Sequence, residues 1–193
     1  MGWTIGKNVR IGFSYICANC IDIGEDTVIG HFNIIGPLRS LQIGKGSFIA
    51  NFNQFLGWRN NSTNADSFGK LVIGENVKFM SHHFIDTAGM INIGRNTVVG
   101  GRNTQFWSHS LTYETVEPKL SYLELSVGED VYIGARSTLV SCSIPDRSVI
   151  GAGSVVTKDF PKENSRLLIA GNPARIRKRY PITASTESFN ECS

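Results

Sequence analysis

Apolar residues recur at every sixth position over most of this chain. The series begins at Ile5, Ile11 and Cys17 and, with four insertions, continues to Val156. It has 21 positions, of which 20 are apolar, whereas an apolar content of 41% would give about nine by chance. Gln105 is the one polar member. Because a period of six matches neither an α-helix nor a simple alternating strand, it predicts a β-solenoid whose six-residue units are each a short strand and a turn.

The repeat also predicts how these units assemble. Three units close one triangular coil, which gives about seven coils starting at residues 5, 23, 43, 73, 93, 127 and 144. Coils stacked about 4.8 Å apart would line the interior with ladders of the repeated apolar residues. Small or β-branched residues such as Val9, Thr27 and Ser47 stand four positions later and are also expected inside. Gly commonly follows the ladder residue, where the chain turns with little steric room.

Each of the four insertions follows the third strand of a coil, so all four are expected to emerge from one edge of the prism. The two long insertions run over residues 57–70 and 110–126. Long loops on one edge of a rigid solenoid are typical of a working face. We therefore expect the functional site at this edge.

Composition and charge exclude several classes of protein. No apolar stretch approaches the roughly 18 residues of a membrane span, so no membrane insertion is expected, and the N-terminus lacks the apolar core of a signal peptide. The four cysteines are scattered, which favours a reducing, cytoplasmic setting with Cys17 and Cys20 as buried thiols. The net charge is +3, and residues 158–179 alone carry +5, which leaves −2 elsewhere. A broad nucleic-acid-binding face is therefore not expected.

The C-terminal third carries a more specific signature. It contains the runs Val-Gly-Glu-Asp-Val-Tyr-Ile-Gly-Ala (127–135), Ile-Gly-Ala-Gly-Ser-Val-Val-Thr-Lys-Asp (150–159) and Ala-Gly-Asn-Pro-Ala-Arg (170–175). In these runs the chain resembles the hexapeptide-repeat acetyltransferases that use acetyl-CoA, such as the maltose and galactoside, xenobiotic and polysaccharide-biosynthesis acetyltransferases. The resemblance covers residues 5–180 and implies an all-β solenoid, the left-handed parallel β-helix. It also implies a homotrimer with three active sites between adjacent prisms.

The same resemblance implies transfer of an acetyl group from acetyl-CoA to a hydroxyl or amino group of a sugar, without a metal and in surface-polysaccharide synthesis. This chemistry needs a general base and donors for the tetrahedral oxyanion. His109 stands in the run Trp-Ser-His-Ser where the fifth coil gives way to the long insertion, and the family's catalytic His precedes its acceptor loop in the same way. We expect His109 to be the base.

His83 has two interpretations of equal weight. The first makes it a second catalytic residue, because it lies one coil before His109, where the family carries an Asn that positions the acceptor. The second makes it a member of an interior polar ladder with Asn33, Asn53 and Asn103. Asp86 is its weaker companion in the first interpretation, and Asn53 is taken as structural.

The remaining site residues follow from the family's motif positions. Ala135 matches the residue whose amide faces the thioester oxygen, and Ala152 the one that bonds the pantetheine arm. Thr157 and Lys158 match nucleotide-binding positions best, followed by Arg175 and Lys178. For Arg177 and Arg179 we favour solvated side chains. Asp86, Trp107 and Tyr113 are the acceptor candidates, and Trp58, Arg59 and Tyr122 in the long loops have side chains suited to clasping a sugar.

These assignments give three segments. Residues 1–158 form the repeat region, residues 159–180 a coenzyme-binding cap that contains a short helix after Pro173, and residues 181–193 a loose tail.

Two other functions are consistent with a solenoid. A γ-carbonic-anhydrase-like zinc protein would need three histidines with a His-x-x-x-x-His pair, which the spacings of 51, 1 and 26 residues between the four histidines do not supply. A non-catalytic scaffold would not need the coenzyme signature.

Overall fold

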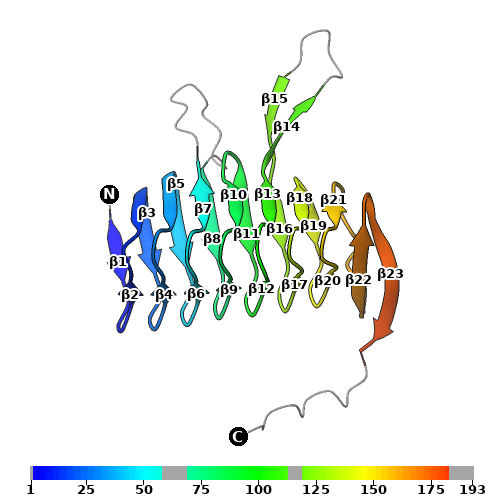
Figure 1. Ribbon diagram of the computed structural model, residues 1–193, viewed down its shortest axis with the longest axis horizontal. Helices are drawn as coiled ribbons and strands as arrows, with labels where there is room; N and C mark the ends of the chain where they lie inside the picture. The colour runs from blue at the N-terminus through cyan, green and yellow to red at the C-terminus, as the bar shows by residue number, and fades with distance from the viewer. Residues whose placement is uncertain (1, 58–68, 113–118, 183–193) are drawn as a thin grey trace, which may run out of the picture.

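The computed structural model describes residues 2–57, 69–112 and 119–182, and these residues form a triangular prism of stacked coils (Figure 1). Strands lie on three faces, and no helix occurs among the described residues. All pairings between coils are parallel. We number the faces in the order in which the chain crosses them within a coil, and we number each edge after the face that precedes it.

The first and third faces belong to one twelve-stranded sheet, because β3 (Tyr15–Ile23) and β5 (Ile34–Ile43) each run across both of them. The other first-face strands are β1 (Trp3–Ile5), β8 (Lys70–Ile73), β11 (Met90–Ile93), β16 (Leu125–Val127) and β19 (Ser143–Ile144). The other third-face strands are β7 (Gln54–Leu56), β10 (Phe84–Asp86), β13 (Gln105–Trp107), β18 (Thr138–Val140) and β21 (Val155–Val156).

The second face is a nine-stranded sheet. Seven of its strands come one from each coil: β2 (Arg10–Ile11), β4 (Val28–Ile29), β6 (Phe48–Ile49), β9 (Lys78–Phe79), β12 (Val98–Val99), β17 (Tyr132–Ile133) and β20 (Val149–Ile150). The seven predicted coils are therefore confirmed. Two further strands, β22 (Ser165–Gly171) and β23 (Ala174–Pro181), extend this sheet at the C-terminal end.

The interior is filled by the predicted ladders. Ile35, Phe55 and Ile85 stack on the third face, and each is fully buried. The position four residues after the ladder residue is also inside, since Thr27, Ser47 and others there have at most 1% of their surface exposed. Hydroxyl groups at this position donate to backbone carbonyls of a neighbouring coil, as from Ser47 Oγ to Gly74 O at 2.8 Å. The apolar ladders and these hydrogen bonds together hold each coil on the next.

The fifth coil departs from the predicted frame. Phe106, not Gln105, pairs with Ile85 and Leu139 in the third-face ladder, and Phe106 is fully buried while Gln105 is exposed. The expectation of a polar ladder residue at Gln105 was wrong. The turn between the second and third faces is one residue longer here, and Gly101 at φ 69° takes up part of the extra length. Burying an aromatic ring in place of an amide gives the physical reason for this register.

The first coil also differs, because Ile16 and not Cys17 occupies the ladder. Ile16 pairs with Ile35 and packs against the core, and the pairing shifts register before Ala18. Cys17 is half-buried and Cys20 is exposed, so the expectation that both are buried thiols was wrong. Cys142 is buried, and desolvation raises the pKa of its thiol to about 12.

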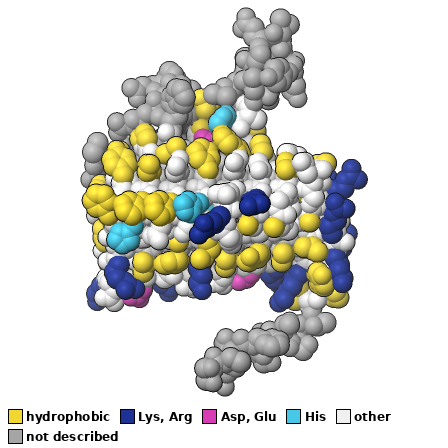
Figure 2. Space-filling view, in the orientation of Figure 1, with side chains coloured by type: hydrophobic (Ala, Val, Ile, Leu, Met, Phe, Trp, Pro, Cys, Tyr) yellow, Lys and Arg dark blue, Asp and Glu magenta, His cyan; other side chains and the backbone are white. Residues whose placement is uncertain are grey.

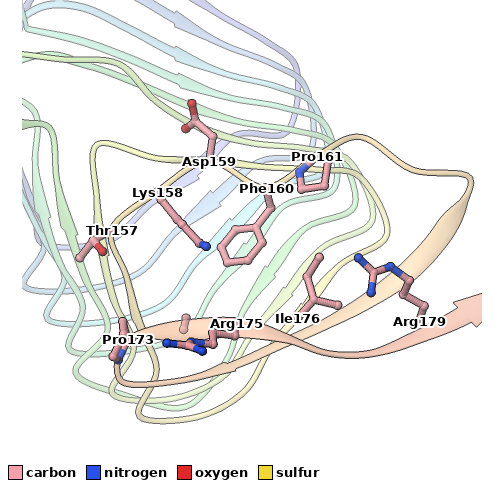
Figure 3. A pocket seen from close by; sticks show the side chains of 10 residues that line it. Thr157, Lys158, Asp159, Phe160, Pro161, Pro173, Arg175, Ile176 and Arg179 are labelled. Atoms are coloured by element: carbon pink, nitrogen blue, oxygen red, sulfur yellow. The ribbon is translucent and has the colours of Figure 1, made fainter.

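The expected helix after Pro173 is not observed. Strands β22 and β23 form an antiparallel hairpin around a turn with a cis Asn172–Pro173 peptide bond, and β22 adds in parallel to β20. Leu167 and Ile169 alternate inward on β22, and their burial favours a strand over a helix. Figure 3 shows this hairpin crossing the open end of the prism.

The third edge carries the predicted insertions. The arm formed by β14 (His109–Thr112) and β15 (Lys119–Tyr122) projects from it as an antiparallel pair (Figure 1). Residues 58–68 and 113–118 in these insertions and the predicted tail from 183 lie outside the described residues. No helix among the described residues has the length and apolar character needed to cross a membrane.

Candidate active site

His109 and Asp86 form a hydrogen-bonded pair at the third edge. His109 Nδ1 lies 2.6 Å from Asp86 Oδ2. His109 is the first residue of β14, and Asp86 ends β10 one coil earlier, where it pairs with Trp107. An ionised carboxylate only accepts hydrogen bonds, so Nδ1 carries the proton and Nε2 carries the lone pair. The arrangement therefore presents an oriented imidazole with Nε2 as a base.

Groups other than His109 also hold the Asp86 carboxylate in place. The Ser108 amide donates to Oδ2 at 3.1 Å, and the Ala88 amide donates to Oδ1 at 3.3 Å. Ser108 Oγ donates to the Asp86 carbonyl at 2.8 Å and accepts from the Gly89 amide at 2.7 Å. Ser108 is fully buried and Asp86 is 8% exposed. A carboxylate held on several sides can orient a neighbouring imidazole without moving.

Aromatic rings flank this pair. The Trp107 ring lies edge to face with His109 at 5.9 Å between centroids, and it packs on Phe84 at 5.1 Å. Trp107 Nε1 donates to Gln105 Oε1 at 3.2 Å, which fixes the indole. Trp107, which was predicted to bind the acceptor, therefore lies beside His109. Of the other two acceptor candidates, Asp86 contacts His109, and Tyr113 lies outside the described residues, as do Trp58 and Arg59.

His83 lies in the interior polar ladder. It is 1% exposed, its amide donates to Asn53 Oδ1 at 2.9 Å, and its Nδ1 accepts from the Thr104 amide at 3.1 Å. Asn53 bonds Asn33 in the same way. Asn103 does not belong to this ladder, because the longer turn of the fifth coil puts Thr104 there instead. The structural interpretation of His83 and Asn53 fits these contacts, so the proposal below uses His109 alone as the base.

The burial of His83 makes the stability of the protein depend on pH. Desolvation lowers its pKa from 6.5 to about 4, since the interior disfavours the imidazolium. The unfolded chain therefore binds this proton below about pH 6.5 while the folded chain does not. The contribution of neutral His83 to the free energy of unfolding is fully present above pH 6.5. It is lost as the pH drops towards 4, by up to about 3 kcal/mol. Denaturant unfolding between pH 7 and pH 4.5 measures this loss. His83→Asn puts the same residue type as Asn53 at this position of the ladder. We expect the unfolding free energy of this variant to depend less on pH than that of the parent. An equal pH dependence in both proteins would contradict the prediction.

Ala135, predicted to face the thioester oxygen, and Ala152, predicted to bond the pantetheine arm, are stacked on the second edge. Ala135 and Ala152 occupy the same turn position in consecutive coils, and the Gly153 amide donates to the Ala135 carbonyl at 2.9 Å. Gly101 continues this line, since a Cβ built there would clash with Ala135 Cβ. Because these residues have little or no side chain, an extended ligand such as a pantetheine arm can lie close to the backbone along this line.

Three predicted nucleotide-binding residues meet at the C-terminal end of the prism. Thr157, Lys158 and Arg175 line a hollow of about 500 Å³ between the last coil and the β22–β23 hairpin (Figure 3). Lys158 Nζ lies 5.7 Å from the centre of the Phe160 ring. Asp159 also lines the hollow, but its side chain points away from Lys158 and its Oδ1 accepts from the Ser143 amide at 2.8 Å. The hollow is therefore bordered by positive side chains.

Arg179 and Lys178 lie on opposite sides of this end of the prism. Arg179 is exposed, as expected, but it also lines the hollow and donates two hydrogen bonds of 2.8 and 3.1 Å to Glu163. These bonds hold the pKa of Glu163 below its usual range. Lys178 does not line the hollow, and its Nζ lies over the Tyr180 ring at 4.7 Å. The alternation of Ala174 and Ile176 with arginines was the available signal, because it marks a strand with opposite faces. A β-bulge in the hairpin then separates Lys178 from the hollow.

The candidate residues of one chain fall on two different edges. His109 follows the third-face strand β13, whereas Ala135 precedes its neighbour β18, and Gln105 pairs with Thr138. By this register Ala135 is level with position 102, so about seven residues separate it from the level of His109, or up to roughly 23 Å at 3.3 Å per residue. One chain cannot bring its own Ala135 amide to the atom next to its own His109.

Among the described residues, no three side chains of His, Cys, Asp or Glu lie close enough to share a metal ion.

Comparison with known proteins identifies the family. Residues 124–158 match the family model described as the hexapeptide repeat of succinyl-transferase. A Bacillus subtilis (strain 168) protein named as an acetyltransferase (YvoF) is 30% identical over 131 residues, which are 66% of this chain and 70% of that protein. The chain belongs to the hexapeptide-repeat acetyltransferases. The sequence resemblance, including the enzyme class, is confirmed.

Two further relatives show the extent of the match. A Schizosaccharomyces pombe protein named as an acetyltransferase is 36% identical over 109 residues, about half of each chain. The crystal structure of the polysialic acid O-acetyltransferase OatWY superposes with a TM-score of 0.55 at 19% identity, and the match covers 95% of this chain and 93% of that one. The fold of this family member is the predicted left-handed parallel β-helix, with a C-terminal hairpin in place of the predicted helix.

Proposed function

We propose that this acetyltransferase uses acetyl-CoA and acts on a hydroxyl or amino group of a sugar, with His109 as the general base. The observation that carries the proposal is the 2.6 Å contact between His109 Nδ1 and Asp86 Oδ2. His109 keeps 34% of its side chain exposed, so substrate can reach it, whereas the carboxylate that orients it is almost fully buried.

The reaction follows from this geometry. Nε2 of His109 takes the proton from the acceptor as its oxygen or nitrogen attacks the thioester carbonyl carbon, and a tetrahedral oxyanion forms. The negative Asp86 carboxylate stabilises the imidazolium that results. When the intermediate collapses, the carbon–sulfur bond breaks, and the imidazolium returns the proton to the leaving sulfur. The products are the acetylated acceptor and CoA, and His109 is again neutral.

The oxyanion needs a donor, and the proposed donor is the Ala135 amide. Because Ala135 and His109 of one chain lie on different edges, the amide would come from an adjacent copy. This requirement supports the homotrimer, in which the third edge of one prism faces the second edge of the next. Each of the three sites then combines His109 and Asp86 of one copy with Ala135 and Ala152 of another.

The coenzyme's phosphates fit the C-terminal end. Lys158 and Arg175 border the hollow there, and positive side chains bind phosphates through charge-assisted hydrogen bonds. Thr157 follows β21 on the third edge, the edge that carries His109 two coils away. Two coils span about 10 Å, so an extended coenzyme can reach from one position to the other.

The acceptor is proposed to be a sugar because Trp107 lies beside His109. Indole rings stack against the apolar faces of sugars, and the Gln105 contact holds this ring in place. His109 lies at the base of the projecting β14–β15 arm (Figure 1). Such an open position admits one unit of a long glycan, which supports a role in surface-polysaccharide synthesis on the cytoplasmic side.

The test is release of the CoA thiol from acetyl-CoA in the presence of free sugars, nucleotide-linked sugars and oligosaccharides. We expect one acceptor class to accelerate release. Lys158→Ala is expected to raise the KM for acetyl-CoA by about tenfold with little change in kcat, because it removes a charged contact to a phosphate. Lys162→Ala is the matched control, since Lys162 is exposed outside the hollow. Absence of both CoA binding and acetyl transfer would contradict the proposal.

A further inference from the structure

Two arginines lie on the second edge next to Ala135. Arg102 belongs to the fifth coil and Arg136 to the sixth, and both side chains are exposed. The Arg136 amide donates to the Arg102 carbonyl at 2.9 Å, just as the Gly153 amide donates to the Ala135 carbonyl one coil later. Arg102 therefore holds in the fifth coil the place that Ala135 holds in the sixth. Because the turn of the fifth coil is one residue longer, Gly101 shares this place with it.

Neither Arg102 nor Arg136 forms an ion pair with a carboxylate of the residues that the structure describes. On the first edge, by contrast, Arg95 of the fifth coil pairs with Glu129 of the sixth at 2.8 Å. The turns of the second edge contain no Asp or Glu over residues 12–15, 30–33, 50–53, 80–83, 100–104, 134–137 and 151–154. Figure 2 shows basic side chains at the middle of the prism with no acidic side chain beside them. Like charges in adjoining strands repel each other, so this pair is explained by a ligand better than by folding.

The direction of the coenzyme decides which substrate Arg102 meets. In the proposed function the coenzyme extends from Lys158 at the C-terminal hollow, past Ala152, to a thioester at Ala135. The acetyl group ends the coenzyme, so the surface on the N-terminal side of Ala135 faces the acceptor and not the coenzyme's phosphates. Arg102 is the nearest charged residue of the second edge on that side. The charge at Arg102 is therefore available to the acceptor.

The fifth coil also carries the proposed general base. His109 follows β13, the third-face strand of the same coil that contains Arg102. In a trimer whose three-fold axis runs along the prisms, equal coils of the three copies lie at equal height. Arg102 of one copy then stands opposite His109 and Trp107 of the adjacent copy. A sugar held on Trp107 with its reacting group at His109 has its other substituents on the side of Arg102.

We propose that Arg102, with Arg136 beside it, binds an anionic substituent of the acceptor. The acceptor is then a sugar that carries a carboxylate or a phosphate, such as a uronic acid or a nucleotide-linked sugar. A guanidinium binds either group through two parallel N–H bonds, and a second positive charge nearby strengthens the attraction. This inference rests on the proposed function, because it needs His109 and Ala135 of adjacent copies to share one site.

The test is the rate of CoA release from acetyl-CoA with acceptors that differ in charge. The probes are uronic-acid oligosaccharides with their carboxyl-reduced neutral counterparts, and nucleotide-linked hexoses with the free hexoses. We expect the parent to prefer the anionic member of one pair by at least about tenfold in kcat/KM, because the neutral member lacks the charge-assisted hydrogen bonds. A preference within the first pair identifies a carboxylate, and a preference within the second identifies a phosphate.

Arg102→Gln is expected to remove this preference by raising the KM for the anionic acceptor at least about tenfold, with an unchanged KM for acetyl-CoA. Arg102→Lys is expected to keep part of the preference, because the ammonium group retains the charge without the planar fork. Arg10→Gln is the matched control, since Arg10 is an exposed arginine of the second face four coils away. We expect this control to keep the preference of the parent.

A parent that acetylates neutral and anionic sugars equally would overturn this inference and leave the proposed function standing. A preference that survives in Arg102→Gln, or that Arg10→Gln also loses, would overturn it as well. A raised KM for acetyl-CoA with an unchanged KM for the acceptor would instead assign Arg102 to the coenzyme, and a lower mass of Arg102→Gln in sedimentation would assign it to the contact between copies. A parent that releases no CoA with any acceptor would contradict the proposed function and this inference together.

Discussion

Replacing His109 with Ala is expected to lower kcat by about 10²- to 10⁴-fold, because this is the usual contribution of a general base. Binding of acetyl-CoA is expected to remain, since the residues at the C-terminal hollow are untouched. The measurement is steady-state release of CoA together with thermal stabilisation of the protein by acetyl-CoA. A variant that binds acetyl-CoA normally and keeps its parent rate would remove His109 from the mechanism.

Asp86 provides the accompanying test of orientation. In Asp86→Asn the amide no longer requires a proton on Nδ1, so the imidazole loses its fixed tautomer and the charge that stabilises the imidazolium. We expect kcat to fall by at least about tenfold with an unchanged KM for acetyl-CoA. A structural role alone would lower thermal stability and leave kcat per folded molecule intact. The split between kcat and KM therefore separates positioning from folding.

Replacing Phe106 with Ala is expected to cost about 3–5 kcal/mol of unfolding free energy, whereas Gln105→Ala should change it by at most about 0.5 kcal/mol. Phe106 is fully buried between Ile85 and Leu139, and Gln105 faces solvent. Denaturant unfolding at one fixed protein concentration compares the two, because an oligomer's stability depends on concentration. The reverse order of effects would restore Gln105 to the interior ladder and shift the register of the fifth coil by one residue.

That register matters for the site as well as for stability. Because Phe106 fills the ladder, Trp107 pairs with Asp86, and His109 starts the arm two residues later. With Gln105 inside, every following side chain would change faces, and the Trp107 ring would not lie beside His109. One additional residue in a turn thus decides which groups meet at the third edge.

The ladders, the coil number and the position of the insertions followed from the sequence because they depend on a local rule. A residue that recurs every six positions must take the same place in each unit of a solenoid, so Ile35, Phe55 and Ile85 stack. The family followed from the runs at 127–135 and 150–159, and His109 was singled out because it precedes an insertion. None of these inferences needed a contact between distant residues.

Only the tertiary structure decided the register of individual units and the contacts of each side chain. It placed Ile16 and Phe106 in the ladder, since the choice between neighbouring residues depends on which side chain fills the interior next to the adjoining coils. It replaced the predicted helix with the β22–β23 hairpin, because β20 offered an open edge to which β22 could add. It also gave His109 its partner, Asp86. The two residues lie 23 positions apart in the sequence, and only the stacking of one coil on the next brings their side chains within 2.6 Å.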